Sequence, residues 1–153
     1  MISPPIDRSA AIDEVAASLL SRASLATRLL LRESRRRLAR SEAGVLAALS
    51  AGPRRVTDLA EVESLAQPTM TLIVKRMEQR GWLARERDAA DGRAVLISLT
   101  DEGATVLDEL RADYRAALRD HMAAMTDEQV EGLMTATAAL QDLIDALQGR
   151  DST

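Results

Sequence analysis

The sequence predicts a mostly helical protein with a minor β component. Apolar residues recur at three- and four-residue steps through most of the 153 residues, which is the spacing of amphipathic helices. The chain has no Phe, one Trp and one Tyr, so its core must be built from aliphatic and Met side chains. Only the segments 82–88 and 93–99 favour strands, and they are close enough to form one hairpin. The length suits one domain with a packed core.

The first two predicted helices cover residues 9–37 and roughly 40–51. In the first, apolar residues from Ile12 to Leu30 share one face, and the segment ends in three consecutive arginines. The second is closed by Gly52-Pro53, because Gly suits the position after a helix and Pro cannot continue one.

A short helix should then open at Thr57, an N-cap candidate, and run to about Val62. The next predicted helix spans 66–80 and stops at Gly81. The hairpin follows, with Val95, Ile97 and Leu99 on its apolar side. A short helix, a tight turn and a second helix, followed at once by a two-stranded hairpin, is the winged helix-turn-helix arrangement.

Two long helices complete the chain. Thr100 should cap a helix that ends near Met122, and Thr126 with Gln129 forms the capping box of the last helix. That helix carries a heptad seam, which consists of Leu133, Thr137, Leu140, Ile144 and Leu147. We therefore expect one compact domain with a helical dimerisation region (1–37 and 101–153) and a winged helix-turn-helix lobe (38–100). Packing of the terminal helices within one chain is the alternative to dimerisation.

The 66–80 helix is the candidate element for reading DNA. Spacing its residues 100° apart places Ala66, Met70, Ile73, Val74 and Met77 on an inner face. The outer face and its flanks then present Gln67, Pro68, Thr69, Thr71, Leu72, Lys75, Arg76 and Gln79. Polar groups near the helix start suit base edges in a major groove, the methyl groups and Leu72 suit thymine methyls, and Lys75 and Arg76 suit phosphates. The simpler interpretation is a solvated polar face.

The hairpin tip reads Asp91-Gly92-Arg93. If the 66–80 helix lies in a major groove, the hairpin reaches the adjacent minor groove, where Arg93 can insert into narrow A·T-rich DNA. Asp91 is placed to pair with Arg93, and Gly92 is expected to supply a positive φ to the turn. A surface salt bridge on an ordinary turn is the competing interpretation.

Charge is distributed unevenly along the chain. Residues 32–93 carry thirteen basic and nine acidic side chains, whereas residues 94–153 carry four and twelve. This asymmetry favours one surface for a polyanion and another that stays away from it.

Other functions find little support. The chain has no Cys and a single His121, so we expect no catalytic centre, no metal site and no cofactor. Scarce aromatic residues disfavour single-stranded nucleic acid. The N-terminus resembles no secretory signal and no run of apolar residues could span a membrane, so a cytoplasmic location is expected.

From about Leu38 to Leu110 the sequence resembles the MarR family of transcriptional regulators. The similarity is carried by "GPRRVTDLAEVESLAQPTMTLIVKRMEQRGWLARERD", "DGRAVLISLT" and "DEGATVL". It implies a recognition helix at Gln67–Arg76 and a wing tip at Asp91–Arg93. The sequence departs from the family where Ala39 and Ala66 replace hydroxyl residues, and where Leu72 and Gly92 replace basic ones.

The resemblance also implies a partner set. It predicts a homodimer with interleaved first and last helices that binds a short, A·T-containing inverted repeat of double-stranded DNA as a repressor. It further implies an apolar pocket for a lipophilic or phenolic effector near Leu25–Leu29, Val45–Leu49 and the 103–118 helix, with Tyr114 and His121 as candidate polar edges. The alternative function is a winged-helix module that binds a protein instead of DNA.

Overall fold

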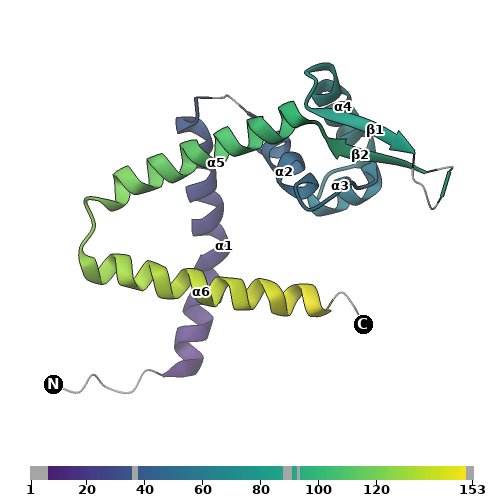
Figure 1. Ribbon diagram of the computed structural model, residues 1–153. Helices are drawn as coiled ribbons and strands as arrows, with labels where there is room; N and C mark the ends of the chain where they lie inside the picture. Colours follow the sequence, from purple (N-terminus) through teal and green to yellow (C-terminus); the bar gives the residue numbers. More distant parts are fainter. Residues whose placement is uncertain (1–6, 36–37, 88–90, 93, 151–153) are drawn as a thin grey trace. The chain divides into compact units, whose positions relative to one another are not determined.

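The computed structural model describes residues 7–35, 38–87, 91–92 and 94–150. These residues form six helices and one two-stranded antiparallel sheet (Figure 1). The elements, in chain order, are α1 (Arg8–Glu33), α2 (Arg40–Leu49), α3 (Val56–Val62), α4 (Gln67–Gln79), β1 (Leu83–Arg87), β2 (Val95–Leu99), α5 (Asp101–Met122) and α6 (Asp127–Arg150). The mostly helical winged helix-turn-helix fold is confirmed. The chain divides into two compact units, Met1–Arg115 and Ala116–Thr153, so α5 belongs to both.

The first helix is shorter than the sequence predicted. Asp7 caps its start by accepting a hydrogen bond from the Ser9 backbone N–H at 3.0 Å. It ends at Glu33 instead of residue 37, because Ser34 adopts an extended conformation there. The Ser34 hydroxyl and the Arg35 backbone N–H both donate to Oδ2 of Asp113 on α5, each at 2.9 Å. The Asp113 carboxylate therefore holds the C-terminal end of α1 against α5.

The short helix α3 begins one residue before the predicted cap. Thr57 lies inside the helix and donates to Oδ1 of Asp58 at 3.1 Å, so its assignment as N-cap is wrong. Arg55 is the N-cap, and its backbone N–H donates to the Asp58 carboxylate at 3.2 Å. Asp58 therefore accepts a hydrogen bond from a backbone N–H that has no partner within the helix, and a hydroxyl side chain at the N-cap is not needed.

The turn between α3 and α4 depends on an unusual backbone conformation. Ser64 has φ of 52°, the left-handed region that a non-Gly residue seldom adopts. Helix α4 starts two residues after Leu65, with Ala66 as an N-cap that makes no side-chain hydrogen bond. Pro68 lies in the first turn of α4, where its missing N–H breaks no helical bond.

The core of the first unit lies beneath α4. Met70, Ile73, Val74 and Met77 are buried, which confirms the predicted inner face, whereas Ala66 is exposed because it precedes the helix. The same cluster of buried side chains includes Val45, Leu46 and Leu49 of α2, Leu59 of α3, Ile97 of β2, and Val106, Leu107 and Leu110 of α5. Burial of a side chain of this size stabilises the fold by roughly 1.5–3 kcal/mol, so this face sets the orientation of α4.

The hairpin pairs Leu83 with Leu99 at its base and Arg87 with Val95 at its outer end. Ile97 is fully buried, but Val95 is 43% exposed, so the predicted apolar side holds only near the core. Arg54 adds one backbone bridge to Ile97, with N···O distances of 2.8 and 3.0 Å. Gly81, with φ of 75°, makes the turn from α4 into β1 that the sequence predicted.

The caps predicted for the last two helices are confirmed. Thr100 Oγ1 accepts from the Gly103 N–H at 3.0 Å, and Thr126 and Gln129 exchange hydrogen bonds of 3.0 and 3.3 Å.

No described residue of α1 or α6 is buried within the single chain. Large apolar side chains are exposed on both helices, among them Val15 and Leu20 on α1 and Leu140 and Leu147 on α6. None of the helices in the described part of the chain is both long and apolar enough to cross a membrane.

Candidate nucleic-acid interface

Helix α4 exposes the side chains that the sequence singled out for DNA reading. Gln67, Pro68, Thr69, Thr71, Leu72 and Lys75 are all exposed, and we call this set the outer face of α4. Leu72 is 69% exposed, although it is the largest aliphatic side chain of the set. The buried face opposite prevents rotation of α4 about its axis, so these side chains are presented in a fixed order. Their contact with DNA stays a prediction.

Thr71 has a specific hydrogen-bonding state. Its hydroxyl donates to the backbone carbonyl of Gln67 at 2.9 Å. Because a hydroxyl has one proton and two lone pairs, Thr71 can still accept from an amino group of a base. Adenine and cytosine present such amino groups in the major groove, which makes Thr71 an acceptor in this geometry.

Arg76 differs from its neighbour Lys75. Its Nε lies 3.0 Å from Oε1 of Glu42, and Arg80 approaches the same oxygen with Nη1 at 3.3 Å. Glu42 is buried, with its side chain 4% exposed, and it belongs to α2. No ion pair engages Lys75 within the described residues. The sequence predicted phosphate contacts for both Lys75 and Arg76, but in the structure Arg76 also holds α4 against α2.

The wing is described only in part. Arg93 lies outside the described residues, and its pairing with Asp91 stays a prediction. Asp91 does lie 3.7 Å from Nη2 of Arg55, at the start of α3, and its carbonyl accepts from the Ala94 N–H at 2.8 Å. Gly92 lacks the positive φ expected of it, since only Gly52 and Gly81 have one among the described glycines.

A hollow of about 410 Å³ lies between the wing and the starts of α3 and α4, lined by Arg55, Val56, Thr57, Gln67, Asp91, Ala94 and Val95. No pattern in the sequence indicated this hollow or the part that Arg55 has in it.

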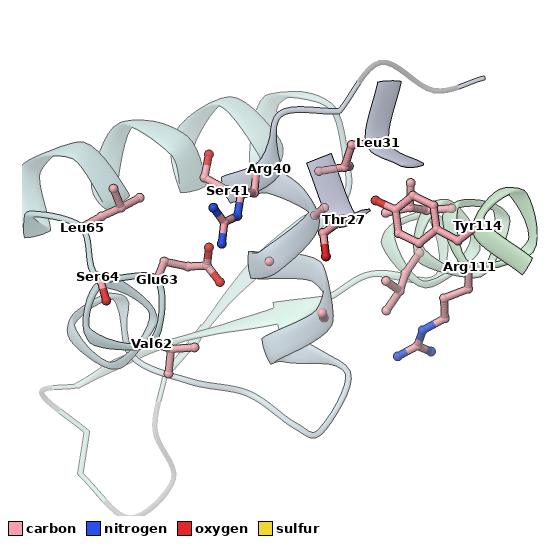
Figure 2. A pocket seen from close by; sticks show the side chains of 15 residues that line it. Thr27, Leu31, Arg40, Ser41, Val62, Glu63, Ser64, Leu65, Arg111 and Tyr114 are labelled. Carbon is pink, nitrogen blue, oxygen red and sulfur yellow. The ribbon is translucent and has the colours of Figure 1, made fainter. Parts of the chain in front are cut away.

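A larger cavity of about 870 Å³ lies within the first unit (Figure 2). Thr27 and Leu31 come from α1, Ala47 and its neighbours from α2, and Leu107, Leu110, Arg111 and Tyr114 from α5. The family resemblance implied these three helices, but the lining residues of α2 are Arg40, Ser41, Ala43, Gly44 and Ala47, and only Ala47 falls within the expected Val45–Leu49. The last residue of α3, Val62, and the turn residues Glu63, Ser64 and Leu65 also line it, a contribution that no sequence pattern indicated. His121 is not among the lining residues.

Two titratable groups in the cavity have raised pKa values. Burial raises the pKa of Tyr114, and its buried hydroxyl has no hydrogen-bond partner on the described protein. Burial also raises the pKa of Glu63, although the nearby Arg40 guanidinium acts in the opposite direction. An uncompensated hydroxyl and a partly desolvated carboxylate in one cavity are typical of a ligand site.

The fold and the outer face of α4 together define a winged helix-turn-helix protein. Residues 45–95 match the family model described as "MarR family". The HTH-type transcriptional repressor MdtR of Bacillus subtilis strain 168 is 32% identical over 97 residues, which are 63% of either chain. Over these residues the chain is similar to the MarR family and to its transcriptional regulators. Its matches span about three fifths of the length of the curated relatives.

Solved structures have the same architecture. The YusO protein of Bacillus subtilis superimposes with a TM-score of 0.65 and 25% identity, over 89% of this chain and 98% of that one. The PcaV transcriptional regulator of Streptomyces coelicolor, solved in complex with its natural ligand, gives a TM-score of 0.57 and 24% identity, over 93% and 98% of the two chains. The likeness therefore extends beyond the winged-helix lobe to the long flanking helices.

Proposed function

We propose that this protein is a cytoplasmic, homodimeric transcriptional regulator that binds double-stranded DNA and represses transcription until a small ligand binds. One observation carries the DNA-binding part. Helix α4 is anchored by a buried face and exposes Gln67, Thr69 and Thr71 near its N-terminal end, with Leu72 and Lys75 beyond. An α-helix fits the major groove, and its N-terminal residues are the ones that reach base edges in helix-turn-helix proteins.

The wing supports the same function. Its tip is attached to the start of α3 by the Asp91–Arg55 ion pair, so both elements belong to one lobe. With α4 in a major groove, we propose that Arg93 enters the adjacent minor groove, where A·T-rich sequence concentrates negative potential. The net positive charge of residues 32–93 supports attraction to phosphates, and the acidic residues after 94 would face away from DNA.

Dimerisation is proposed from the exposed apolar side chains of α1 and α6. Monomers rarely leave contiguous apolar patches open to water. A second copy of the chain is the partner that would cover equivalent patches on both molecules symmetrically. Two α4 helices in a twofold dimer would meet major grooves about 34 Å apart, so the operator should be a short inverted repeat.

Ligand response is proposed from the cavity. Its volume falls in the usual range for small-molecule sites, and its lining comes from α1 and α5 as well as from the helix-turn-helix. PcaV was solved with its natural ligand, which supports the same kind of response here. A ligand can change DNA affinity only by binding the two states of the protein unequally.

A footprint of the purified protein on the DNA upstream of its own gene tests this function. We expect protection of a short inverted repeat, and we expect log affinity to fall steeply as log salt concentration rises, because phosphate contacts release counterions. Weak salt dependence with no protected sequence would favour the alternative, a winged-helix module that binds a protein.

A further inference from the structure

The cavity has two chemically different ends. Arg111 and Tyr114 project from α5 on one side, and Glu63 and Arg40 face each other on the other side (Figure 2). The first end offers the guanidinium of Arg111, which lies 3.7 Å from Asp108 Oδ1 and donates to the Ser50 hydroxyl at 3.3 Å, and the hydroxyl of Tyr114, which has no hydrogen-bond partner on the described protein. The second end pairs a carboxylate with a guanidinium that influences it electrostatically. Apolar residues, including Leu31, Leu107 and Leu110, contribute to the lining as well.

The position of Glu63 depends on Gly44. The Glu63 carboxylate occupies the space directly over the Gly44 Cα on α2, where any Cβ would overlap with it: a Cβ built at position 44 would lie 2.1 Å from Oε1 and 2.4 Å from Cδ of Glu63. A glycine at this site of α2 therefore lets the carboxylate lie against the helix backbone, inside the cavity wall.

The Glu63 carboxylate lacks hydrogen-bond donors in this position. Across the described residues, no hydrogen bond or ion pair within 4.0 Å reaches its oxygens, and Arg40 acts on it only at longer range. An ionised carboxylate accepts up to about four hydrogen bonds, and leaving its oxygens without donors where water is partly excluded costs free energy. A ligand in the cavity that carries an N–H or O–H group would remove this deficit.

We propose that Glu63 determines the ligand specificity of this cavity, which takes a largely apolar anion with a hydrogen-bond donor at the end remote from its charge. The anionic group lies toward Arg111 and the Tyr114 hydroxyl, and the donor binds Glu63. Arg40 offsets the Glu63 charge, so a neutral donor is sufficient and a second cation is not needed. This inference rests on the ligand response proposed above, and it adds the chemistry that the ligand must have.

The same contact would carry the ligand signal to the DNA-binding elements. Glu63 is the C-cap residue of α3 and immediately precedes Ser64, whose positive φ forms the turn into α4. A ligand that draws the carboxylate from its place over Gly44 acts on the residue that joins the two helices. A ligand that lacks the donor occupies the cavity without acting on this residue.

Three matched probes test the specificity by calorimetry on the full-length protein without DNA. They are a naphthoate with a hydroxyl on the opposite ring, its methoxy counterpart, and unsubstituted naphthoate. We expect the hydroxy compound to bind the native protein about tenfold or more tightly than the other two, because a hydrogen bond to a charged acceptor is stronger than one between neutral groups. Equal affinities, or no binding of any probe at millimolar concentration, would overturn the proposal.

Two variants locate the preference. Glu63→Leu removes the carboxylate, and Gly44→Ala keeps it but displaces it, since the clash involves only the flexible end of the side chain. Both should reduce the preference for the hydroxy compound to less than about threefold. Glu61→Leu, the same change at an exposed position of α3 outside the cavity lining, should keep the native preference. Circular dichroism confirms folding of each variant, and a preference that survives in both folded cavity variants contradicts the role of Glu63.

Operator binding separates this inference from the proposed function. If the protein binds its operator but the hydroxy probe shows no preference, only the ligand chemistry is wrong. If the probe preference is present and depends on Glu63 while no operator is found, the DNA-binding function is wrong and the cavity specificity stands.

Discussion

Arg76 Nε on α4 lies 3.0 Å from Oε1 of Glu42, a residue of α2 that is only 3% exposed. Glu42 Oε2 also accepts from the Ala39 backbone N–H at 3.0 Å, at the start of α2. Arg80 approaches the carboxylate from the next turn of α4, and its guanidinium stacks 4.8 Å from the centre of the Trp82 ring. One buried carboxylate thus caps one helix and orients another.

Glu42→Gln should destabilise the fold. The amide keeps one acceptor oxygen but no charge, so both arginines lose charge-assisted hydrogen bonds. Because the arginines are about half exposed, we expect a loss of about 1–3 kcal/mol in the free energy of unfolding, measured by urea denaturation. Glu61→Gln, at an exposed site on α3, should stay within ~0.5 kcal/mol of the native protein. Equal effects of the two changes would mean that the Glu42 contacts contribute nothing specific.

Lys75→Ala and Arg76→Ala should differ although the residues are adjacent. Lys75→Ala removes a phosphate contact, so operator affinity should fall for all sequences alike and the salt slope should flatten by about one unit. Arg76→Ala should also lower thermal stability, because it leaves the buried Glu42 with one arginine fewer. Operator titrations at several salt concentrations and melting curves measure both effects. A Lys75 variant that melts earlier than the Arg76 variant would reverse these assignments.

Gln67→Ala and Thr71→Val should change which operators are preferred. Each base contact that is lost should cost about 1–3 kcal/mol on the native operator and less on sites altered at the corresponding base pair. Thr71→Val keeps the methyl group and shape but removes the lone pairs that can accept from a base. Selection of binding sites from a random DNA pool gives the comparison. An unchanged preferred sequence in both variants would show that this part of α4 acts only by charge and shape.

Arg93→Ala should weaken operator binding most where the flanking sequence is A·T-rich, because a narrow minor groove attracts the guanidinium most strongly. The matched comparison is the same operator with G·C flanks, measured with both proteins. Asp91→Asn should weaken operator binding less, with the same dependence on the flanks, since it removes the ion pair between the wing and Arg55 but keeps the Arg93 guanidinium. A uniform loss on both flanks would place Arg93 on phosphates instead.

Stability should depend on pH through Glu63. Burial raises the pKa of Glu63 above its ordinary value of 4.5, so the folded state binds the proton more tightly than the unfolded state does. The stability gained from this proton is fully present below pH 4.5 and is lost as pH rises through the folded-state pKa. Glu63→Gln cannot lose that proton, so its stability relative to the native protein should improve across this window. Urea denaturation at a series of pH values measures the difference, and a constant or declining difference would contradict the desolvation of Glu63.

Local sequence pattern determined the element order, the cap at Thr100, the capping box at Thr126 and the two faces of α4, because each depends on residues within a turn or two of one another. The start of α3 was predicted at Thr57 instead of Arg55, since Asp58 can serve a helix start without a hydroxyl cap. The wing turn was predicted with a positive φ at Gly92, which its closed Asp91–Ala94 hydrogen bond does not require.

Only the tertiary structure decided which distant side chains meet. Glu42 with Arg76, Asp113 with Ser34, and Glu63 over Gly44 join residues that lie far apart in the chain, and no periodicity relates them. Their contacts arise when apolar faces pack and bring unrelated polar groups to the same place. Helices and their faces are therefore determined by short-range spacing, whereas the anchoring of α4 and the chemistry of the cavity are set by packing among α1, α2, α3, α4 and α5.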